Sequence, residues 1–413
     1  MDLSGRADGA EATSDSRAAG RRIVFIAWRD LANPDAGGSE LLVDRLAAGL
    51  AERGDQVALL CGGPVADRRP YRVHRAGGSY SQFARVPIVL RRRAADCDLV
   101  VEVCNGMPFL VPLWTRRPAL CLVNHVHTQL WSLRFRWPVA AAGQFLESVA
   151  MPWAHRRNLF LTVSASTSAA LRGLGVGADR IRVISNGVEP APPPAPRSPE
   201  PLFLALGRLA PYKRIDLLLR IWNRVRPVTG GRLVIAGDGP ERDRLRALAG
   251  PGVEFTGRVP EDVKHRLLSA AWLLLHPASV EGWGIVVTEA ALRGTPAVGF
   301  RVPGLRDSVV AGRTGLLAGT ETEFASAWAS LAIDHRTRAA MGRAARDRAM
   351  GLHWSAAVDG FSAVADEVIA MAGGPGRSPS RCQAPAGSPG QEAVPVPAGP
   401  GVPPGGPGPW PPR

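Results

Sequence analysis

A proline-rich stretch near the middle of the chain constrains the fold more than any other feature. Residues 189–201 contain seven prolines, three of them in a row at positions 192–194. Proline has a fixed φ angle and no backbone N–H group, so this run continues neither a helix nor a sheet and is typical of a stiff linker. The linker divides the 413-residue chain into two segments, each long enough to form its own hydrophobic core.

Both segments alternate short apolar runs with amphipathic runs. In the first segment we expect a helix at 40–53 and strands at 22–28, 56–60, 99–103, 119–124, 160–164 and 181–184. In the second segment we expect helices at 216–226 and 241–249 and strands at 202–206, 232–236, 253–255, 271–276 and 297–300. Strands that alternate with helices form parallel βαβ units. The sequence therefore predicts an α/β fold with two similar Rossmann-like domains.

The domain organisation follows from the same pattern. We expect a disordered N-terminus at 1–20, a first domain at 21–188, the linker at 189–201, a second domain at 202–353, a C-terminal helix at 354–372 that packs back on the first domain, and a disordered Pro/Gly-rich tail at 373–413. Residues 1–20 lack the apolar core of a signal peptide. The five cysteines form no C-x-x-C pair, which favours a reducing, cytoplasmic setting.

The segment from Glu281 to Glu289 carries the strongest chemical signal. It follows an apolar run and begins a helical pattern. Gly282 and Gly284 let a ligand approach the backbone closely, and the amides at the start of a helix suit a diphosphate. Glu281 and Glu289 can each accept hydrogen bonds from hydroxyl groups. The segment fits a ligand with phosphates between two hydroxylated rings, as in a nucleotide sugar.

A second cluster of polar residues directly follows the first strand of the second domain. Open α/β sheets bind ligands at the carboxyl ends of their strands. There Arg208 can bind a phosphate through its guanidinium fork, and Lys213 can bind one as a point charge. Of the 50 basic residues, 48 are arginine, so Lys213 indicates a site where arginine would not fit, whereas Arg208 alone is equally consistent with a solvated surface residue. Asp216 is expected to cap the next helix.

These motifs together resemble the donor site of family-4 glycosyltransferases, which are retaining enzymes of the GT-B fold. The resemblance rests on Gly207-Arg208, Lys213, Asp216 and the Glu281–Glu289 pair with its glycines. It extends over residues 22–370 through further motifs, namely Gly37-Gly38-Ser39-Glu40, Val163-Ser164, Asn186-Gly187-Val188 and Gly237 to Pro240.

The resemblance implies a role for each matching residue. Arg208 and Lys213 would hold the donor diphosphate, Glu281 would contact hydroxyls of the transferred sugar, and Glu289 would bind the ribose. The Gly37-Gly38 loop would approach the diphosphate from the first domain. The complete set of donor-binding residues that the resemblance implies is Gly37, Gly38, Gly207, Arg208, Lys213, Glu281, Gly282, Gly284, Ile285, Val286 and Glu289. For Glu289, the alternative is an exposed helix carboxylate paired with Arg293.

The family also has a first-domain histidine beside the donor sugar. His125 and His127 both follow the strand at 119–124, and the His127-Thr128 pair resembles the family pattern better. The catalytic set is then His127, Arg208, Lys213 and Glu281. Relatives often carry glutamate where Asp307 lies, so the identity of the sugar is not predicted.

The resemblance implies transfer of a hexose-type sugar from a nucleotide-diphosphate sugar to a hydroxyl of a glycan, a lipid-linked acceptor or a small molecule, with retention of configuration. No cofactor and no metal are expected, because two cations can take the diphosphate charge. Asp96-Cys97-Asp98 has the D-x-D form of metal-dependent enzymes, but it precedes an apolar strand instead of following one. The alternatives are a hydrolase or epimerase of the same fold, or a non-catalytic nucleotide-sugar-binding protein.

The formal charge of +14 favours anionic ligands or surfaces, and no nucleic-acid-binding motif is present. Two stretches suggest peripheral contact with an anionic membrane, on the inner face of the plasma membrane. Arg85 and Arg91 to Arg93 flank the apolar residues 86–90, and an aromatic segment extends from Trp131 to Trp137. The alternative is an ordinary solvated basic helix.

Overall fold

The computed structural model describes residues 20–63, 68–190 and 193–373. The predictions of disorder for the N-terminus and for the tail after residue 373 fall on residues outside these ranges. Among the described residues, no helix combines the length and the apolar content that crossing a bilayer requires.

The first half of the chain forms a seven-stranded parallel sheet in the order β3-β2-β1-β4-β5-β6-β7. Its strands are β1 (Arg22–Ile26), β2 (Gln56–Cys61), β3 (Arg72–Arg75), β4 (Leu99–Cys104), β5 (Ala119–Val123), β6 (Leu159–Thr162) and β7 (Ile181–Val183). Its helices are α1 (Gly38–Glu52), α2 (Gln82–Arg93), α3 (Thr128–Arg134), α4 (Val139–Phe145), the π-helical turn η2 (Leu146–Ala150), α5 (Met151–Ala154) and α6 (Ala165–Gly173). Every residue of β4 and β5 is buried, which explains their continuous apolar sequences.

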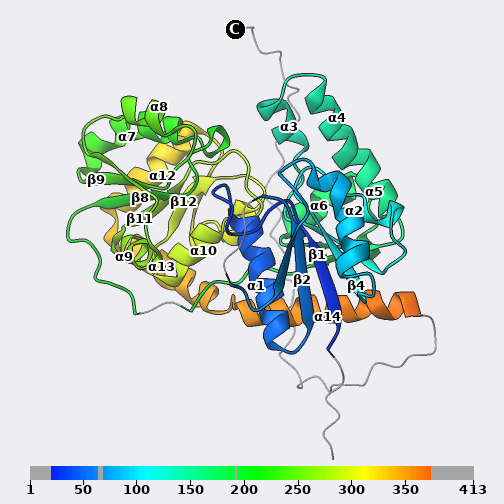
Figure 1. Cartoon of the computed structure of the whole chain (residues 1–413). Helices are drawn as coiled ribbons and strands as arrows, with labels where there is room; N and C mark the ends of the chain where they lie inside the picture. Colours follow the sequence, from blue (N-terminus) through cyan, green and yellow to red (C-terminus); the bar gives the residue numbers. More distant parts are fainter. Residues whose placement is uncertain (1–19, 64–67, 191–192, 374–413) are drawn as a thin grey trace, which may run out of the picture. The chain divides into compact units, whose positions relative to one another are not determined.

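The second half forms a six-stranded parallel sheet in the order β10-β9-β8-β11-β12-β13. Its strands are β8 (Leu202–Leu206), β9 (Arg232–Ala236), β10 (Val253–Gly257), β11 (Leu273–His276), β12 (Ala297–Phe300) and β13 (Gly315–Ala318). The helices are α7 (Ile215–Thr229), α8 (Arg242–Ala247), α9 (Glu261–Ala270), α10 (Ile285–Leu292), α11 (Leu305–Ser308), α12 (Glu321–Ile333), α13 (His335–Met350) and α14 (Trp354–Gly373). Helices lie on both faces of each sheet, as Figure 1 shows.

The strand orders place the candidate site. In both sheets the chain adds two strands outward on one side and then returns to the other side of its first strand, so each sheet has a switch point, between β1 and β4 and between β8 and β11. Ligands of open α/β sheets bind at such points, outside the carboxyl ends of the strands. The loops that follow β1, β8 and β11 carry Gly37-Gly38, Lys213 and Glu281.

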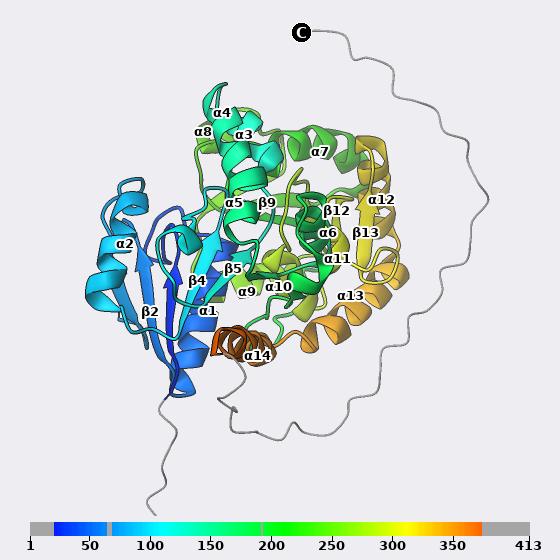
Figure 2. The same ribbon diagram turned by 90° about the vertical axis from the view of Figure 1, so that its right-hand side faces the viewer.

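The last helix belongs to the packing of the first sheet. α14 lies alongside α1 and contacts β4 and β5, and two views show it beside α1 (Figures 1 and 2). The rings of Phe25 on β1 and Phe361 on α14 stack with centroids 5.4 Å apart. The chain thus returns from the second sheet to complete the core of the first.

Several expected elements differ from the observed ones. The edge strands β3 and β13 were not predicted: β3 has the polar sequence Arg-Val-His-Arg, whereas β13 has the short apolar sequence Gly-Leu-Leu-Ala. After β13 the chain forms two helices, α12 and α13, and the Asp334 side chain starts α13 by accepting a hydrogen bond from the Thr337 backbone N–H. The expected capping role of Asp216 is wrong: α7 begins at Ile215, and Asp216 pairs with Arg220 at 3.2 Å in the first turns of the helix.

Candidate active site

The centre of the candidate site is a side-chain cluster that joins the loops after β8 and β11. The Lys213 ammonium donates to the Glu281 carboxylate at 2.6 Å, and His276 Nε2 lies 3.2 Å from the same oxygen of Glu281. Lys213 ends the short 3₁₀ helix η4 (Pro211–Lys213), whereas His276 is the last residue of β11. The fold therefore brings together two predicted site residues that lie 68 positions apart in the sequence.

The cluster is largely buried, with 19% of the Lys213 and 17% of the Glu281 side chain exposed, and its charges depend on one another. Burial acts to raise the pKa of Glu281, but Lys213 and His276 outweigh it and hold that pKa well below the usual range. Burial acts to lower the pKa of Lys213, but Glu281 outweighs it and raises the pKa. The pKa of His276 is lowered, chiefly by burial. Lys213 and Glu281 therefore form a charged pair, with a neutral His276 beside it.

A pocket opens next to this pair at the ends of β8, β9 and β11. Its lining residues include Gly207, Arg208, Lys213 and His276. Arg208 points across to the loop after β1, where its guanidinium meets the Asp35 carboxylate at 2.7 Å. Two cations thus lie at one pocket, one held by Glu281 and the other by Asp35.

The loop after β1 faces the second sheet at close range. A Cβ atom on Gly38 would lie 3.1 Å from Ile285 Cδ1, so a larger residue here would press on the start of α10. The Gly37 N–H donates to Glu40 Oε2 at 2.8 Å, and Glu40 Oε1 accepts from Arg29 at 2.8 Å. These bonds fix the loop at the first turn of α1.

The start of α10 has the properties expected of an anion site. Gly284 precedes the helix with a φ of 90°, a left-handed conformation that favours glycine. The first amides of a helix have no partner within the helix, so the N–H groups of Ile285 and Val286 can meet a ligand. Lys213 and Glu281 lie in the loops that flank this helix start.

Glu289 lies one helical turn beyond Ile285 and has a partner that the sequence reasoning missed. Lys264 on α9 donates to Glu289 Oε1 at 2.8 Å and to Glu261 at 2.7 Å. Burial acts to raise the pKa of Glu289, and the Lys264 ammonium opposes that rise. Each of the two lysines in the chain is therefore paired with one glutamate of the Glu281–Glu289 motif. The signal was available, because Lys264 is as unusual in this arginine-rich sequence as Lys213.

The two candidate histidines stack on each other, with ring centroids 3.7 Å apart. His125 lies next to the Glu281 loop, because a Cβ on Gly282 would be 3.4 Å from its Cβ and Nδ1. Burial, and then the neighbouring His127, lower the pKa of His125 to about 3, so its ring is neutral. His127 precedes α3, where its backbone N–H donates to Glu147 Oε1 at 2.6 Å.

The remaining candidates have structural roles. Asp307 accepts from the Gly304 N–H at 3.2 Å and from the Ser166 N–H at 3.3 Å, so it joins α11 to α6. Asp98 accepts from the Arg22 backbone N–H at 2.8 Å, and Asp96 pairs with the Arg22 side chain. Both carboxylates of the Asp-x-Asp motif lie where β1 and β4 begin, whereas the site loops follow the ends of their strands.

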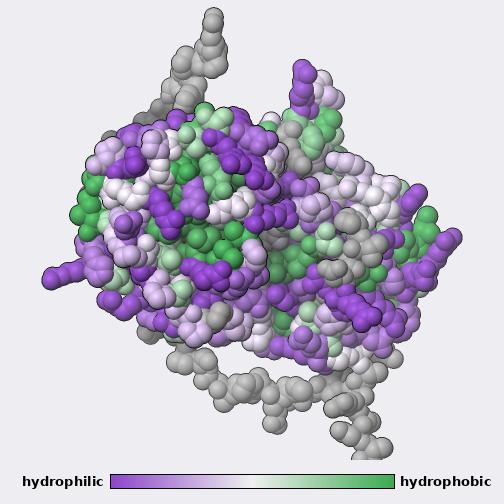
Figure 3. Space-filling model, turned by 60° about the vertical axis from the view of Figure 1, so that its left-hand side comes forward, coloured by the Kyte–Doolittle hydropathy of each residue, from purple (hydrophilic) through white to green (hydrophobic). Residues whose placement is uncertain are grey.

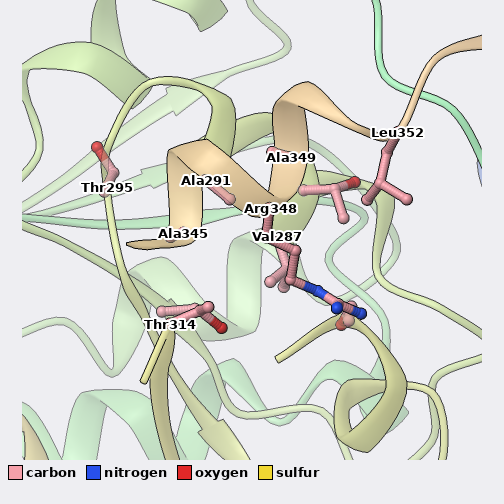
Figure 4. A pocket seen from close by; sticks show the side chains of 11 residues that line it. Val287, Ala291, Thr295, Thr314, Ala345, Arg348, Ala349 and Leu352 are labelled. Carbon is pink, nitrogen blue, oxygen red and sulfur yellow. The ribbon is translucent and has the colours of Figure 1, made fainter. Parts of the chain in front are cut away.

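A second pocket lies between α10 and α13. Figure 4 shows it lined by small side chains such as Ala291 and Ala345, with Arg348 at one side. Neither Lys213 nor Glu281 lines it. This pocket is separate from the cluster that carries the charged pair.

Two open parallel sheets with their switch points define the GT-B class of fold. The structure is similar to sucrose-phosphate synthase of Thermosynechococcus elongatus, with a TM-score of 0.73 over 85% of this chain and 100% of that chain at 20% identity. It is also similar to Anabaena HepE in complex with UDP and glucose, with a TM-score of 0.69 over 84% of this chain and 100% of that chain at 19% identity.

Sequence comparison identifies the family. Residues 191–348 match Glycosyl transferases group 1, and residues 36–192 match Glycosyltransferase Family 4. The GDP-mannose-dependent alpha-(1-6)-phosphatidylinositol monomannoside mannosyltransferase of Mycolicibacterium smegmatis is 30% identical over 60% of this chain and 69% of its own length. The chain therefore belongs to the group 1 glycosyltransferases.

A further relative shares a smaller part of its length. The D-inositol 3-phosphate glycosyltransferase of Acidothermus cellulolyticus is 34% identical over 225 residues, which are 48% of this chain and 50% of that protein. This chain thus spans half the length of that curated relative.

Proposed function

We propose that this chain transfers a hexose-type sugar from a nucleotide-diphosphate sugar to a hydroxyl acceptor, with retention of the anomeric configuration. The observation that carries the proposal is the 2.6 Å pair of Lys213 and Glu281 beside Arg208 at one pocket. A cation for the diphosphate and a carboxylate for sugar hydroxyls lie next to each other there. The names of the relatives support a nucleotide-linked donor, since one uses GDP-mannose and HepE was crystallised with UDP and glucose.

The Lys213–Glu281 and Lys264–Glu289 pairs are compatible with binding of a nucleotide-sugar donor. An ammonium group has three N–H donors, so Lys213 can hold Glu281 and a phosphate oxygen at once, which a planar guanidinium in a fixed fork does less well. Arg208 and the first amides of α10 take the other diphosphate oxygens. Glu289 accepts from the ribose hydroxyls while Lys264 holds its other side.

The transfer step needs no covalent enzyme intermediate. The acceptor oxygen forms a bond to the anomeric carbon on the face that the leaving group departs from. The bond from that carbon to the diphosphate breaks, its electron pair stays on the diphosphate oxygen, and this oxygen takes the acceptor proton. Lys213, Arg208 and the α10 amides stabilise the growing negative charge, a preorganised electrostatic effect. The proposal assigns this charge to the protein alone, with neither a metal nor a cofactor.

The sugar lies on the side of the stacked histidines. The sequence favours His127 as the histidine beside the sugar, whereas the contacts with Gly282 favour His125. We propose that the two rings line the sugar side together, with His125 nearer to Glu281. The proposal also places the enzyme in the cytoplasm, where the four buried free cysteines of the described residues would stay reduced.

The test is a donor screen followed by a transfer assay. Thermal shifts of the purified full-length chain with UDP-, GDP- and ADP-sugars identify the donor. The labelled donor is then incubated with a panel of hydroxyl acceptors, and the anomeric configuration of the product is determined by NMR. A glycosylated product with the donor's configuration supports the proposal. Free sugar alone across the panel would identify a hydrolase, and binding without any turnover a non-catalytic binding protein.

A further inference from the structure

A helical hairpin lies next to the first sheet and consists of α3 and the continuous α4-η2-α5 segment. The side chains on its inner side pack against one another. α3 and α4 lie side by side in both views (Figures 1 and 2). Trp131 of α3 lies against Gly143 of α4, and its Nε1 donates to Glu147 at 3.2 Å. Gln144 donates to the Thr128 carbonyl at 2.9 Å. These contacts account for the inner side of the hairpin.

The hairpin also exposes apolar side chains. Six large apolar side chains of the hairpin are 51–82% exposed, and we call them the apolar ridge: Leu133, Trp137, Val139, Phe145, Val149 and Trp153. Phe145, Val149 and Trp153 follow one another at four-residue intervals, which places them on one face of the helix. Among the described residues, Trp137 and Trp153 are the two tryptophans that are more than half exposed. Apolar side chains gathered in this way mark an interaction surface.

The charge around the ridge has one sign. Between residues 103 and 178 the sequence has seven arginines and one carboxylate in a side chain, Glu147. Glu147 is 1% exposed and faces the inside of the hairpin. Arg156 lies over the Trp153 ring, with its guanidinium carbon 5.1 Å from the ring centroid. The segment that carries the ridge therefore combines exposed aromatic and aliphatic side chains with several arginines and no exposed carboxylate.

The other stretch that suggested membrane contact is different. On α2, Val86 and Leu90 are buried in the core beneath β2 and β4, so they cannot meet a lipid. The exposed side of α2 carries Arg91 to Arg93 and one large apolar side chain, Ile88. Of these two stretches, the hairpin therefore carries the larger group of exposed apolar side chains.

We propose that the apolar ridge docks this protein on the surface of an anionic bilayer. Tryptophan prefers the boundary between lipid headgroups and acyl chains, and arginines next to it bind anionic headgroups. A second copy of the chain fits less well as the occupant, because two ridges face to face would bring like-charged arginines together, and the segment that carries them has no exposed carboxylate to pair with them.

Docking of the hairpin on a bilayer suggests where the sugar acceptor comes from, an inference that rests on the proposed function. α3 begins at Thr128, directly after His127, and a Cβ on Gly106 would lie 3.5 Å from both His127 Cγ and Trp131. The hairpin that meets the lipid is therefore continuous with the histidine side of the candidate site. An acceptor hydroxyl carried on a lipid headgroup would reach that side from the membrane.

The experiment is flotation of the full-length chain with vesicles of phosphatidylcholine alone or with about one-third phosphatidylglycerol, at low and high salt. We expect binding to the anionic vesicles at low salt and weaker binding at high salt. The triple variant Trp137→Ser, Phe145→Ser, Trp153→Ser should bind at least about tenfold more weakly. A matched control changes three exposed apolar residues elsewhere, Val228→Ser, Leu248→Ser and Ile333→Ser, and should bind like the unmodified chain.

Donor binding separates this inference from the proposed function. The ridge variant should keep the thermal shift produced by the donor, because no ridge residue lines the donor pocket. The docking proposal is overturned if the chain does not bind anionic vesicles at low salt, or if the ridge and control variants bind equally. It is also overturned if the ridge variant alters only self-association in sedimentation. A chain that docks but transfers no sugar leaves the docking intact and refutes the proposed function.

Discussion

Fully or largely buried carboxylates serve different purposes in the two sheets. In the first, Glu102 accepts from the backbone N–H groups of Phe109, Leu110 and Val111 at 2.6–3.0 Å and pairs with His155 at 2.8 Å, with both side chains fully buried. Glu147 likewise accepts from the His127 N–H. In the second sheet, Glu281 and Glu289 are each held by a lysine side chain.

The two kinds of carboxylate differ in whether an arriving ligand can take the place of their hydrogen-bond partner. A carboxylate saturated by backbone N–H groups shapes a loop, and Leu110 keeps a left-handed φ of 53° in such a loop. A carboxylate held by a flexible ammonium can exchange or share its partner when a diphosphate or a hydroxyl arrives. We therefore expect substitutions in the first group to change stability and those in the second to change binding and rate.

The largest expected effect is on stability, from Glu102→Gln. Breaking a buried pair typically costs about 3–5 kcal/mol in the free energy of unfolding. Burial acts to raise the pKa of Glu102, but His155 and the backbone N–H groups lower it overall. The ionised Glu102 therefore stabilises the fold fully at a pH above the ordinary carboxyl pKa. This stabilisation is lost as the pH falls through the lowered pKa of Glu102 in the folded chain. Urea unfolding measures the difference in the free energy of unfolding between the variant and the unmodified chain. This difference should be large at neutral pH and become smaller in acid. A difference that does not change with pH would contradict the structural role of the Glu102 carboxylate.

Lys213→Ala should act on transfer. Removing one preorganised donor to a developing anion costs about 10²–10³-fold in rate, or about 2.7–4 kcal/mol. Circular dichroism should show an unchanged fold, and kcat/KM for the donor is the measurement. Arg220→Ala, which removes an exposed cation on the adjacent helix, is the matched control and should have little effect. A near-normal rate in Lys213→Ala would refute the assignment of this site.

Glu289→Ala should also abolish most transfer, and its partner gives a finer test. Without the Lys264 ammonium, burial raises the pKa of Glu289 unopposed and weakens its hold on hydroxyls. We expect Lys264→Ala to weaken nucleotide binding about tenfold, the loss typical of a supporting residue around a bound group. Calorimetry with UDP, GDP and ADP measures it, and Lys264→Arg should recover part of the affinity. Equal affinities in Lys264→Ala and the unmodified chain would show that this lysine supports the fold alone.

The smallest effect is expected from Asp35→Ala. The Arg208–Asp35 pair is exposed, so its loss should change stability by less than about 1 kcal/mol. Release of Arg208 should leave nucleotide affinity equal or a few-fold higher, as measured by the same calorimetry. A large drop in affinity would place Asp35 among the binding residues and weaken the distinction between the two kinds of carboxylate.

Much of the fold could be predicted from periodicity. The bounds of β8, β9 and β12 agree with the expected ranges, because central parallel strands are continuous apolar runs between turn residues. The edge strand β3 could not be predicted, since its polar sequence lacks that pattern, whereas the short apolar run of β13 was overlooked. His276 was missed for a related reason: it ends an apolar strand, and its proximity to Glu281 exists only after the strand and the loop have folded.

The sequence by itself determined the two α/β segments, the linker between them and the types of residue that carry the chemistry. Spacing and composition encode these, because strand and helix periods are local properties of the chain. Only the tertiary structure decided which groups meet: Lys213 with Glu281, Lys264 with Glu289 and His125 with the Gly282 loop. It also decided that Trp137 and Trp153 lie outside while Trp131 lies inside the hairpin. These pairings depend on strand order and helix packing, which bring together residues far apart in the chain, and no local pattern records them.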